Sequence, residues 1–130
     1  MNIGLLGFGA ISLKVFQYFS KIDTDIKFKK ILVRNAKKYF YLDNDLITDV
    51  PEIFFKEKFD YVLEGAGHQA LFSYGPKILK NKSNLLITST GALTDDVFFQ
   101  NLISLSKKYN KKIIIPSAGI GALDILTASS

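Results

Sequence analysis

Short apolar runs alternate with longer segments of helical period along this chain. Strands are expected over 2–6, 26–33, 46–48, 59–63, 84–88 and 112–115. Helices are expected over 10–20, 68–81 and 94–109, with a short one beginning near Pro51 and a further one over 120–128. In segment 10–20, Ile11, Val15 and Phe19 recur at spacings that place them on one helical face. The alternation predicts strand–helix–strand units and a mainly parallel sheet of about six strands.

Local signals also mark where two of these helices are expected to begin or break. Asp49 is expected to cap the helix that begins near Pro51, since aspartate is a preferred N-cap residue. Proline is tolerated there because the first turn does not need its missing N–H. Gly75 and Pro76 are expected to kink or split segment 68–81, since proline lacks the N–H that the helix needs.

The composition excludes several kinds of chemistry. The chain has 130 residues, 48% of them hydrophobic, which suffices for one domain with its own core over 1–130. It has no cysteine and one histidine. A disulfide framework, a thiolate nucleophile, a cysteine-based zinc site and a multi-histidine metal site are therefore excluded, and no metal is expected. The glycine-broken amino terminus has no basic segment before it, so we expect neither a signal peptide nor a membrane span, and a cytoplasmic location.

The net charge of +5 is compatible with either a nucleic acid or an anionic cofactor as partner. The lysines are scattered in pairs near the expected ends of elements, such as Lys29-Lys30 and Lys107-Lys108. That distribution is typical of a solvated surface, so no nucleic-acid partner is expected.

One segment between the first expected strand and the first expected helix has the form G-x-G-x-x-S: Gly7-Phe8-Gly9-Ala10-Ile11-Ser12. Gly7 permits the tight turn, and Gly9 lets the backbone approach a pyrophosphate without a Cβ in the way. The start of the helix, at Ala10 and Ile11, presents free N–H groups to that anion. Ser12 replaces a third glycine whose role is close packing of helix on strand, and its small side chain is compatible with that role. The segment predicts a dinucleotide site.

The residues after the second expected strand bear on the choice of cofactor. An Asp or Glu is expected there when the adenosine ribose has a free 2′-hydroxyl, but this chain has Arg34 and Asn35, followed by Lys37 and Lys38. An arginine can pair with a 2′-phosphate. The cofactor is therefore expected to be NADP or NAD, with NADP favoured.

Small residues follow three later strands of the same predicted sheet edge: Gly65, Ala66 and Gly67 with His68; Thr90 with Gly91; and Ala118 with Gly119. Short loops of this kind leave room for a flat cofactor to lie across the carboxyl ends of the strands. His68 is interpreted as a cofactor-site or capping residue rather than a general acid or base, and Glu64 as a strand-end carboxylate. The elements and loops together predict a Rossmann fold, doubly wound, with helices on both faces of the sheet.

Four stretches, spread over almost the whole chain, carry a family resemblance: Ile3-Gly4-Leu5-Leu6-Gly7-Phe8-Gly9-Ala10-Ile11, Tyr61-Val62-Leu63-Glu64-Gly65-Ala66-Gly67-His68-Gln69-Ala70, Ser89-Thr90-Gly91-Ala92-Leu93, and Ile115-Pro116-Ser117-Ala118-Gly119-Ile120-Gly121-Ala122-Leu123-Asp124. With them, the sequence resembles the amino-terminal NAD(P)-binding domain of the L-aspartate dehydrogenase family. The first is shared by many Rossmann enzymes, whereas the last two are more specific. In the last, Ala118-Gly119 stands where the family has Gly-Ala, and Ala122 where it has Gly, a departure that is compatible with a divergent branch acting on another amino acid.

The resemblance implies oxidation of L-aspartate to iminoaspartate, which hydrolyses to oxaloacetate, with hydride transfer to NAD(P), by a homo-oligomer. The family's catalytic histidine and an asparagine near the nicotinamide lie in a second domain. Neither is matched here, and His68 does not inherit that role. We therefore expect the chain to be part of a longer enzyme whose carboxy-terminal substrate domain is absent, to contain no catalytic residue, and to be inactive alone.

Three alternatives remain open. One is another NAD(P)-dependent amino-acid dehydrogenase, such as a homoserine or diamino-acid dehydrogenase. The second is a non-catalytic module that senses NADP(H). The third is an S-adenosylmethionine methyltransferase, which is disfavoured because those enzymes usually have an acid where Arg34 stands.

Overall fold

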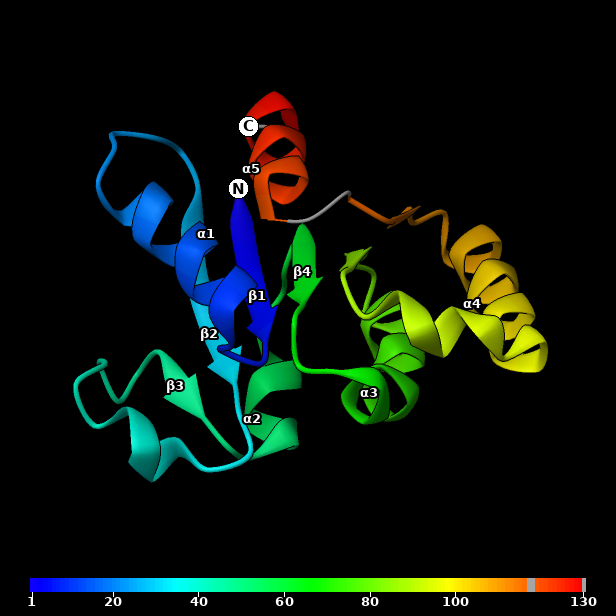
Figure 1. Cartoon of the computed structure of the whole chain (residues 1–130), viewed down its shortest axis with the longest axis horizontal. Coiled ribbons are helices and arrows are strands. Elements are labelled where there is room, and N and C mark those ends of the chain that lie inside the picture. The colour runs from blue at the N-terminus through cyan, green and yellow to red at the C-terminus, as the bar shows by residue number, and fades with distance from the viewer. Residues whose placement is uncertain (117–118, 130) are drawn as a thin grey trace.

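A computed structural model of the chain describes residues 1–116 and 119–129 (Figure 1). The elements are, in chain order, β1 (Asn2–Leu6), α1 (Ala10–Ser20), β2 (Lys27–Leu32), η1 (Ala36–Tyr39), β3 (Ile47–Thr48), α2 (Pro51–Lys56), β4 (Tyr61–Glu64), α3 (His68–Lys80), β5 (Asn84–Ile87), η2 (Thr90–Thr94), α4 (Asp96–Tyr109), β6 (Ile113–Ile114) and α5 (Gly119–Ser129). The predicted bounds of the first strand and first helix are confirmed. The later strands are shorter than expected.

The described strands form one sheet of six, all parallel, in the order β3-β2-β1-β4-β5-β6. The chain moves outward from β1 to β3, then returns to the other side of β1 and moves outward again to β6. This is the doubly wound Rossmann arrangement, and the predicted fold class is confirmed. The order reverses between β1 and β4, so the connections that leave their carboxyl ends diverge and a crevice opens between them.

The core has two layers, one on each face of the sheet. Alternate strand residues such as Leu5 and Leu63 pack with Val15 of α1 and Leu126 of α5. On the other face, the strand residues Leu6, Val62 and Leu85 pack with one residue each from α2, α3 and α4: Phe54, Leu71 and Leu102. Figure 1 shows α1 and α5 side by side, away from α3 and α4. Each fully buried side chain of this kind contributes about 1.5–3 kcal/mol, so the two layers hold the sheet edge rigid.

One expectation about a helix boundary is wrong, and a second is wrong in part. Asp49 does not cap α2, whose N-cap is Val50 and has no side-chain hydrogen bond. Its carboxylate accepts instead from the N–H of Ala36, the first residue of η1, at 3.0 Å. Of the kink or split expected at Gly75-Pro76, the split does not occur, since α3 runs from His68 to Lys80 with Pro76 inside it. Gly75 is buried against Leu71 and Leu102, and this packing between sheet and α4 overrides the local preference.

A cleft at the carboxyl ends of the strands

The turn after β1 is shaped by the close approach of two backbones. Gly7 has φ +86°, a conformation that favours glycine. Its N–H donates to the carbonyl of Leu32 at 2.7 Å. A Cβ at Gly7 would lie 2.7 Å from the Cα of Ala66, on the β4–α3 connection. The turn therefore requires glycine for two reasons, and it brings the connections after β1 and β4 into contact where the strand order reverses.

The first turn of α1 is open to an anion. Gly9 is its N-cap and supplies no side chain, and the first turn has no acidic residue. The first intrahelical hydrogen bond runs from the N–H of Leu13 to the carbonyl of Gly9, which leaves the N–H groups of Ala10 and Ile11 without an intrahelical partner. These groups and the helix dipole favour negative charge.

Ser12, which stands in place of the third glycine, fits the space that a glycine usually fills. The residue is fully buried, and a Cβ at Gly65 would lie only 2.7 Å from its Oγ. Within the described residues, that Oγ has no hydrogen-bond partner. The helix thus packs closely against the β4–α3 connection, and the serine is accommodated at the expense of one unpaired hydroxyl.

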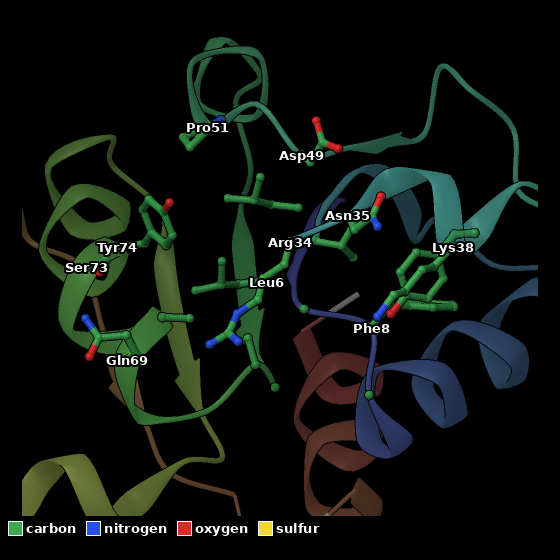
Figure 2. A pocket seen from close by; sticks show the side chains of 18 residues that line it. Leu6, Phe8, Arg34, Asn35, Lys38, Asp49, Pro51, Gln69, Ser73 and Tyr74 are labelled. Atoms are coloured by element: carbon green, nitrogen blue, oxygen red, sulfur yellow. The ribbon is translucent and has the colours of Figure 1, made fainter.

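The β2–η1 connection carries Arg34 and Asn35. Arg34 is exposed, and Figure 2 shows its side chain extending into the cleft, away from Asp49. Asn35 caps η1, with Oδ1 accepting from the N–H of Lys37 at 3.1 Å. Of the two lysines that follow, Lys38 lines the cleft, and Lys37 is not among its lining residues.

The cleft has a volume of about 670 Å³. Six residues proposed from the sequence line it: Gly7, Gly9, Arg34, Asn35, Gly65 and Ala66. Sequence reasoning missed Asp49 and a stripe on α3, of which Gln69, Ser73 and Tyr74 are labelled in Figure 2 opposite Phe8 and Lys38. The i, i+4 spacing of Gln69 and Ser73, just after a strand end that the motif already implicated, is the signal that could have found this stripe.

The other sequence-predicted residues that the structure describes fully are not among those that line this cleft: Ala10, Ile11, Gly67, His68, Thr90 and Gly91. Gly67 has φ +107° and immediately precedes α3. His68 is exposed, and a Cβ at Gly91 would overlap its ring, so the start of α3 meets η2 there, next to Thr90. Ala118 lies outside the described residues. Gly119 is the first residue of α5.

Glu64, the last residue of β4, is fully buried, and its carboxylate accepts hydrogen bonds from the segment after β4 and from the segment after β5. Its Oε1 accepts from the N–H of Ala66 at 3.1 Å, the N–H of Gly67 at 3.2 Å and the Oγ of Ser89 at 2.6 Å. Its Oε2 accepts from the N–H groups of Thr88 and Ser89 at 3.2 and 3.0 Å. The carboxylate therefore joins the segment after β4 to the segment after β5.

Comparison with known proteins decides the family. Residues 7–116 match the family described as the NAD-binding domain of homoserine dehydrogenase. The chain belongs to this family of NAD-binding domains. The match begins at the first glycine of the turn and ends after β6, so it contains the connections after β1, β2, β4 and β5 but not α5.

This NAD-binding domain is also similar to L-aspartate dehydrogenases. It is 32% identical over 126 residues to the L-aspartate dehydrogenase of Methanospirillum hungatei, and the match covers 97% of this chain and 50% of the relative. It is 34% identical over 137 residues to that of Methanocaldococcus jannaschii, covering 98% and 49%. The domain thus spans about half the length of the curated relatives it matches, their amino-terminal half.

Solved structures give the same picture. Aspartate dehydrogenase from Thermotoga maritima superimposes with a TM-score of 0.66 at 29% identity, covering 98% of the domain and 50% of that chain. Homoserine dehydrogenase from S. aureus superimposes with a TM-score of 0.72 at 21% identity, covering 89% and 32%. The second likeness shows the fold alone.

The residues of the NAD-binding domain fit a dinucleotide. A Cβ would fill the turn at Gly7, the helix behind it begins without a side-chain cap, and the adjoining cleft contains a cationic side chain, Arg34. No group of three or more histidine, aspartate or glutamate side chains within residues 1–116 and 119–129 could hold a metal ion. Over the same residues, no helix is long and apolar enough to cross a membrane.

Proposed function

We propose that this chain is the NAD(P)-binding half of an amino-acid dehydrogenase that oxidises L-aspartate, and that it prefers NADP(H). The observation that carries the cofactor proposal is the cleft itself. It joins an uncapped helix N-terminus, at Gly9, to an arginine at the end of β2, where NAD-specific domains place an acid. The substrate proposal rests on the relatives, which are named L-aspartate dehydrogenases.

The cofactor is proposed to lie across the carboxyl ends of the strands. The N–H groups of Ala10 and Ile11 would bind the pyrophosphate, and the Arg34 guanidinium would pair with the 2′-phosphate of the adenosine ribose. Asn35 would hold the turn that presents Arg34, through its cap on η1. Lys38, on η1 and opposite the α3 side chains in Figure 2, adds positive charge to the cleft.

The nicotinamide half would lie beyond the glycine turn, over β4 and β5. There Gly65, Ala66, Gly67 and Gly91 offer a surface with little side-chain bulk, and His68 and Thr90 border it. When bound, the nicotinamide ring supplies hydride acceptance. The residues of this chain form the wall against which the ring would be held, and Ala118 and Gly119 are proposed to complete it. Positioning of the amino acid and removal of its proton need groups that we assign to a second domain.

Titration of the 130-residue chain with NADPH and NADH tests the cofactor proposal directly. We expect saturable binding of both, with NADPH tighter. A turnover assay tests the division of labour. The chain alone is expected to reduce no NADP with L-aspartate, while the Methanospirillum hungatei relative, as positive control, reduces NAD or NADP. Turnover by the chain that disappears in His68→Ala would contradict both the assignment of catalysis to a second domain and the exclusion of His68 as the base.

Homoserine is a second candidate substrate, because the matching family is described by homoserine dehydrogenase. A fusion of residues 1–130 to the carboxyl-terminal half of the Thermotoga maritima enzyme tests whether the chain supports aspartate oxidation. We expect activity with L-aspartate, and more than in a matched fusion to the carboxyl-terminal half of the S. aureus homoserine dehydrogenase assayed with L-homoserine, because the foreign half supplies the amino-acid pocket in both. A homo-oligomer is proposed on the resemblance alone, and light scattering on the fusion protein tests it.

A further inference from the structure

Glu64 has an environment that a strand-end carboxylate does not need. Burial of a carboxylate is costly, and the cost is offset only when charged or strongly polar partners surround it. Five donors surround Glu64, and all of them belong to the segments immediately after β4 and β5. Because an ionised carboxylate is an acceptor only, this set of donors matches the charged form.

The two bound segments also meet at their base and, further along, where His68 packs on Gly91. The Oγ1 of Thr88 donates to the backbone carbonyl of Glu64 at 2.7 Å, and Ile87 pairs with Glu64 in the sheet. Beyond that point the strands have ended, and the side chain of Glu64 continues the connection between them. It accepts from Gly67, whose φ of +107° sets the entry into α3, and from Ser89, which precedes η2.

These segments border the part of the edge that the adenosine half does not use. If Arg34 binds the 2′-phosphate over β2, and the helix N-terminus of α1 binds the pyrophosphate, the strand order places β4 and then β5 next along the cofactor. Ala66 touches the glycine turn, and His68 packs on Gly91 further along.

We propose that Glu64 is a positioning residue for the nicotinamide half of the cofactor. This inference rests on the proposed cofactor function. Through its hydrogen bonds to Ala66, Gly67 and Ser89, the carboxylate fixes two loops as one wall, and it does so without touching the adenosine half. Loss of the carboxylate should therefore weaken binding of the whole dinucleotide but leave binding of its adenosine half unchanged.

The experiment compares two ligands on three proteins. Binding of NADPH, and of 2′,5′-ADP as the adenosine half, is measured for the parent chain, Glu64→Gln and Glu52→Gln. In Glu64→Gln an amide NH₂ faces backbone donors, so NADPH affinity is expected to fall by about tenfold or more, while 2′,5′-ADP affinity stays within about twofold. Glu52 is an exposed acid on α2, and its variant should bind both ligands as the parent does.

A parallel fall in both affinities, or no fall in either, would refute the positioning role. If Glu64→Gln shows no cooperative melting, Ser89→Ala decides, because it removes a single donor and retains the carboxylate. For Ser89→Ala we expect NADPH affinity to fall by about threefold to tenfold with 2′,5′-ADP unchanged, and unchanged NADPH affinity would overturn the proposal. Failure of the parent chain to bind either ligand would instead remove the proposed cofactor function, and this inference with it.

Discussion

The side chain of Asp49 and the backbone of Ala36 are joined by a hydrogen bond of 3.0 Å between Oδ2 and the amide N. The bond connects the segment after β3 to the turn that presents Arg34. Asp49 also lines the cleft, so its carboxylate has two opposing effects on an anionic ligand. It anchors the turn that carries the cationic side chain, and its own negative charge repels a phosphate.

Substitution can separate these two effects. Asp49→Asn retains an acceptor for Ala36 and removes the charge, so NADPH is expected to bind about twofold to fivefold more tightly, with a smaller change for NADH. Asp49→Ala removes both the acceptor and the charge, and the loosened turn should lower the affinity for NADPH instead. Isothermal titration of the two variants with both cofactors measures this difference, and equal behaviour of the Asn and Ala variants would contradict it.

The preference for NADP(H) is expected to depend on Arg34. A charge-assisted contact with the 2′-phosphate predicts that Arg34→Asp loses about tenfold to a hundredfold in NADPH affinity and then prefers NADH. Lys37→Asp is the matched control, since it makes the same change of charge three residues away on a side chain that is not among those lining the cleft. Its preference should stay with NADPH. Fluorescence titration suffices, and equal preference in the parent and Arg34→Asp would remove Arg34 from the site.

The two glycines of the turn should fail in different ways. Among the described residues, a Cβ at Gly9 would meet the carbonyl of Gly65 alone, at 3.4 Å, whereas at Gly7 it would meet Ala66 in a backbone conformation unsuited to other residues. Gly9→Val is expected to melt near the parent temperature while losing NADPH binding, because the side chain covers the helix N-terminus. Gly7→Ala should lower the melting temperature. Wild-type affinity in Gly9→Val would show that the phosphate site is elsewhere.

The unpaired hydroxyl of Ser12 predicts a gain in stability on its removal. Ser12→Ala leaves the close packing against Gly65 unchanged and removes a buried polar group that has no partner among the described residues. The free energy of unfolding is expected to rise by about 1 kcal/mol, as measured by urea denaturation of the chain without cofactor. A loss of similar size would mean that the hydroxyl binds a buried water. Ser20→Ala is a control at an exposed serine of the same helix.

Much of the fold and part of the site could be predicted because their signals are local. The first strand, the glycine turn and the first helix are contiguous, so Gly7, Gly9 and the uncapped start of α1 follow from one short segment. Arg34 could be identified for the same reason, as the residue after the second strand. Parallel strands bring such ends to one edge whatever the details of the sheet.

The parts that sequence reasoning missed depend on contacts between distant segments. Asp49 was expected to cap the helix beside it, but an amide 13 residues away competes for the same carboxylate and wins. Ser73 and Tyr74 reach the cleft because α3 packs beside the crevice, and no local sequence pattern predicts that packing. The hydrogen bonds of Glu64 could not be predicted from its own segment, because they depend on β5 lying next to β4: three of the five donors come from Thr88 and Ser89.

The contact between Gly7 and Ala66 also limits how the cleft can adapt. Where these two connections meet, backbone lies against backbone and a methyl group, so no rotamer change there can widen or narrow the crevice. Ligands of different size must therefore be accommodated by the long side chains at the rim, such as Arg34, Gln69 and Tyr74. Laboratory evolution toward another nucleotide should accordingly collect its substitutions at the rim, and change Gly7 and Ala66 only as a pair.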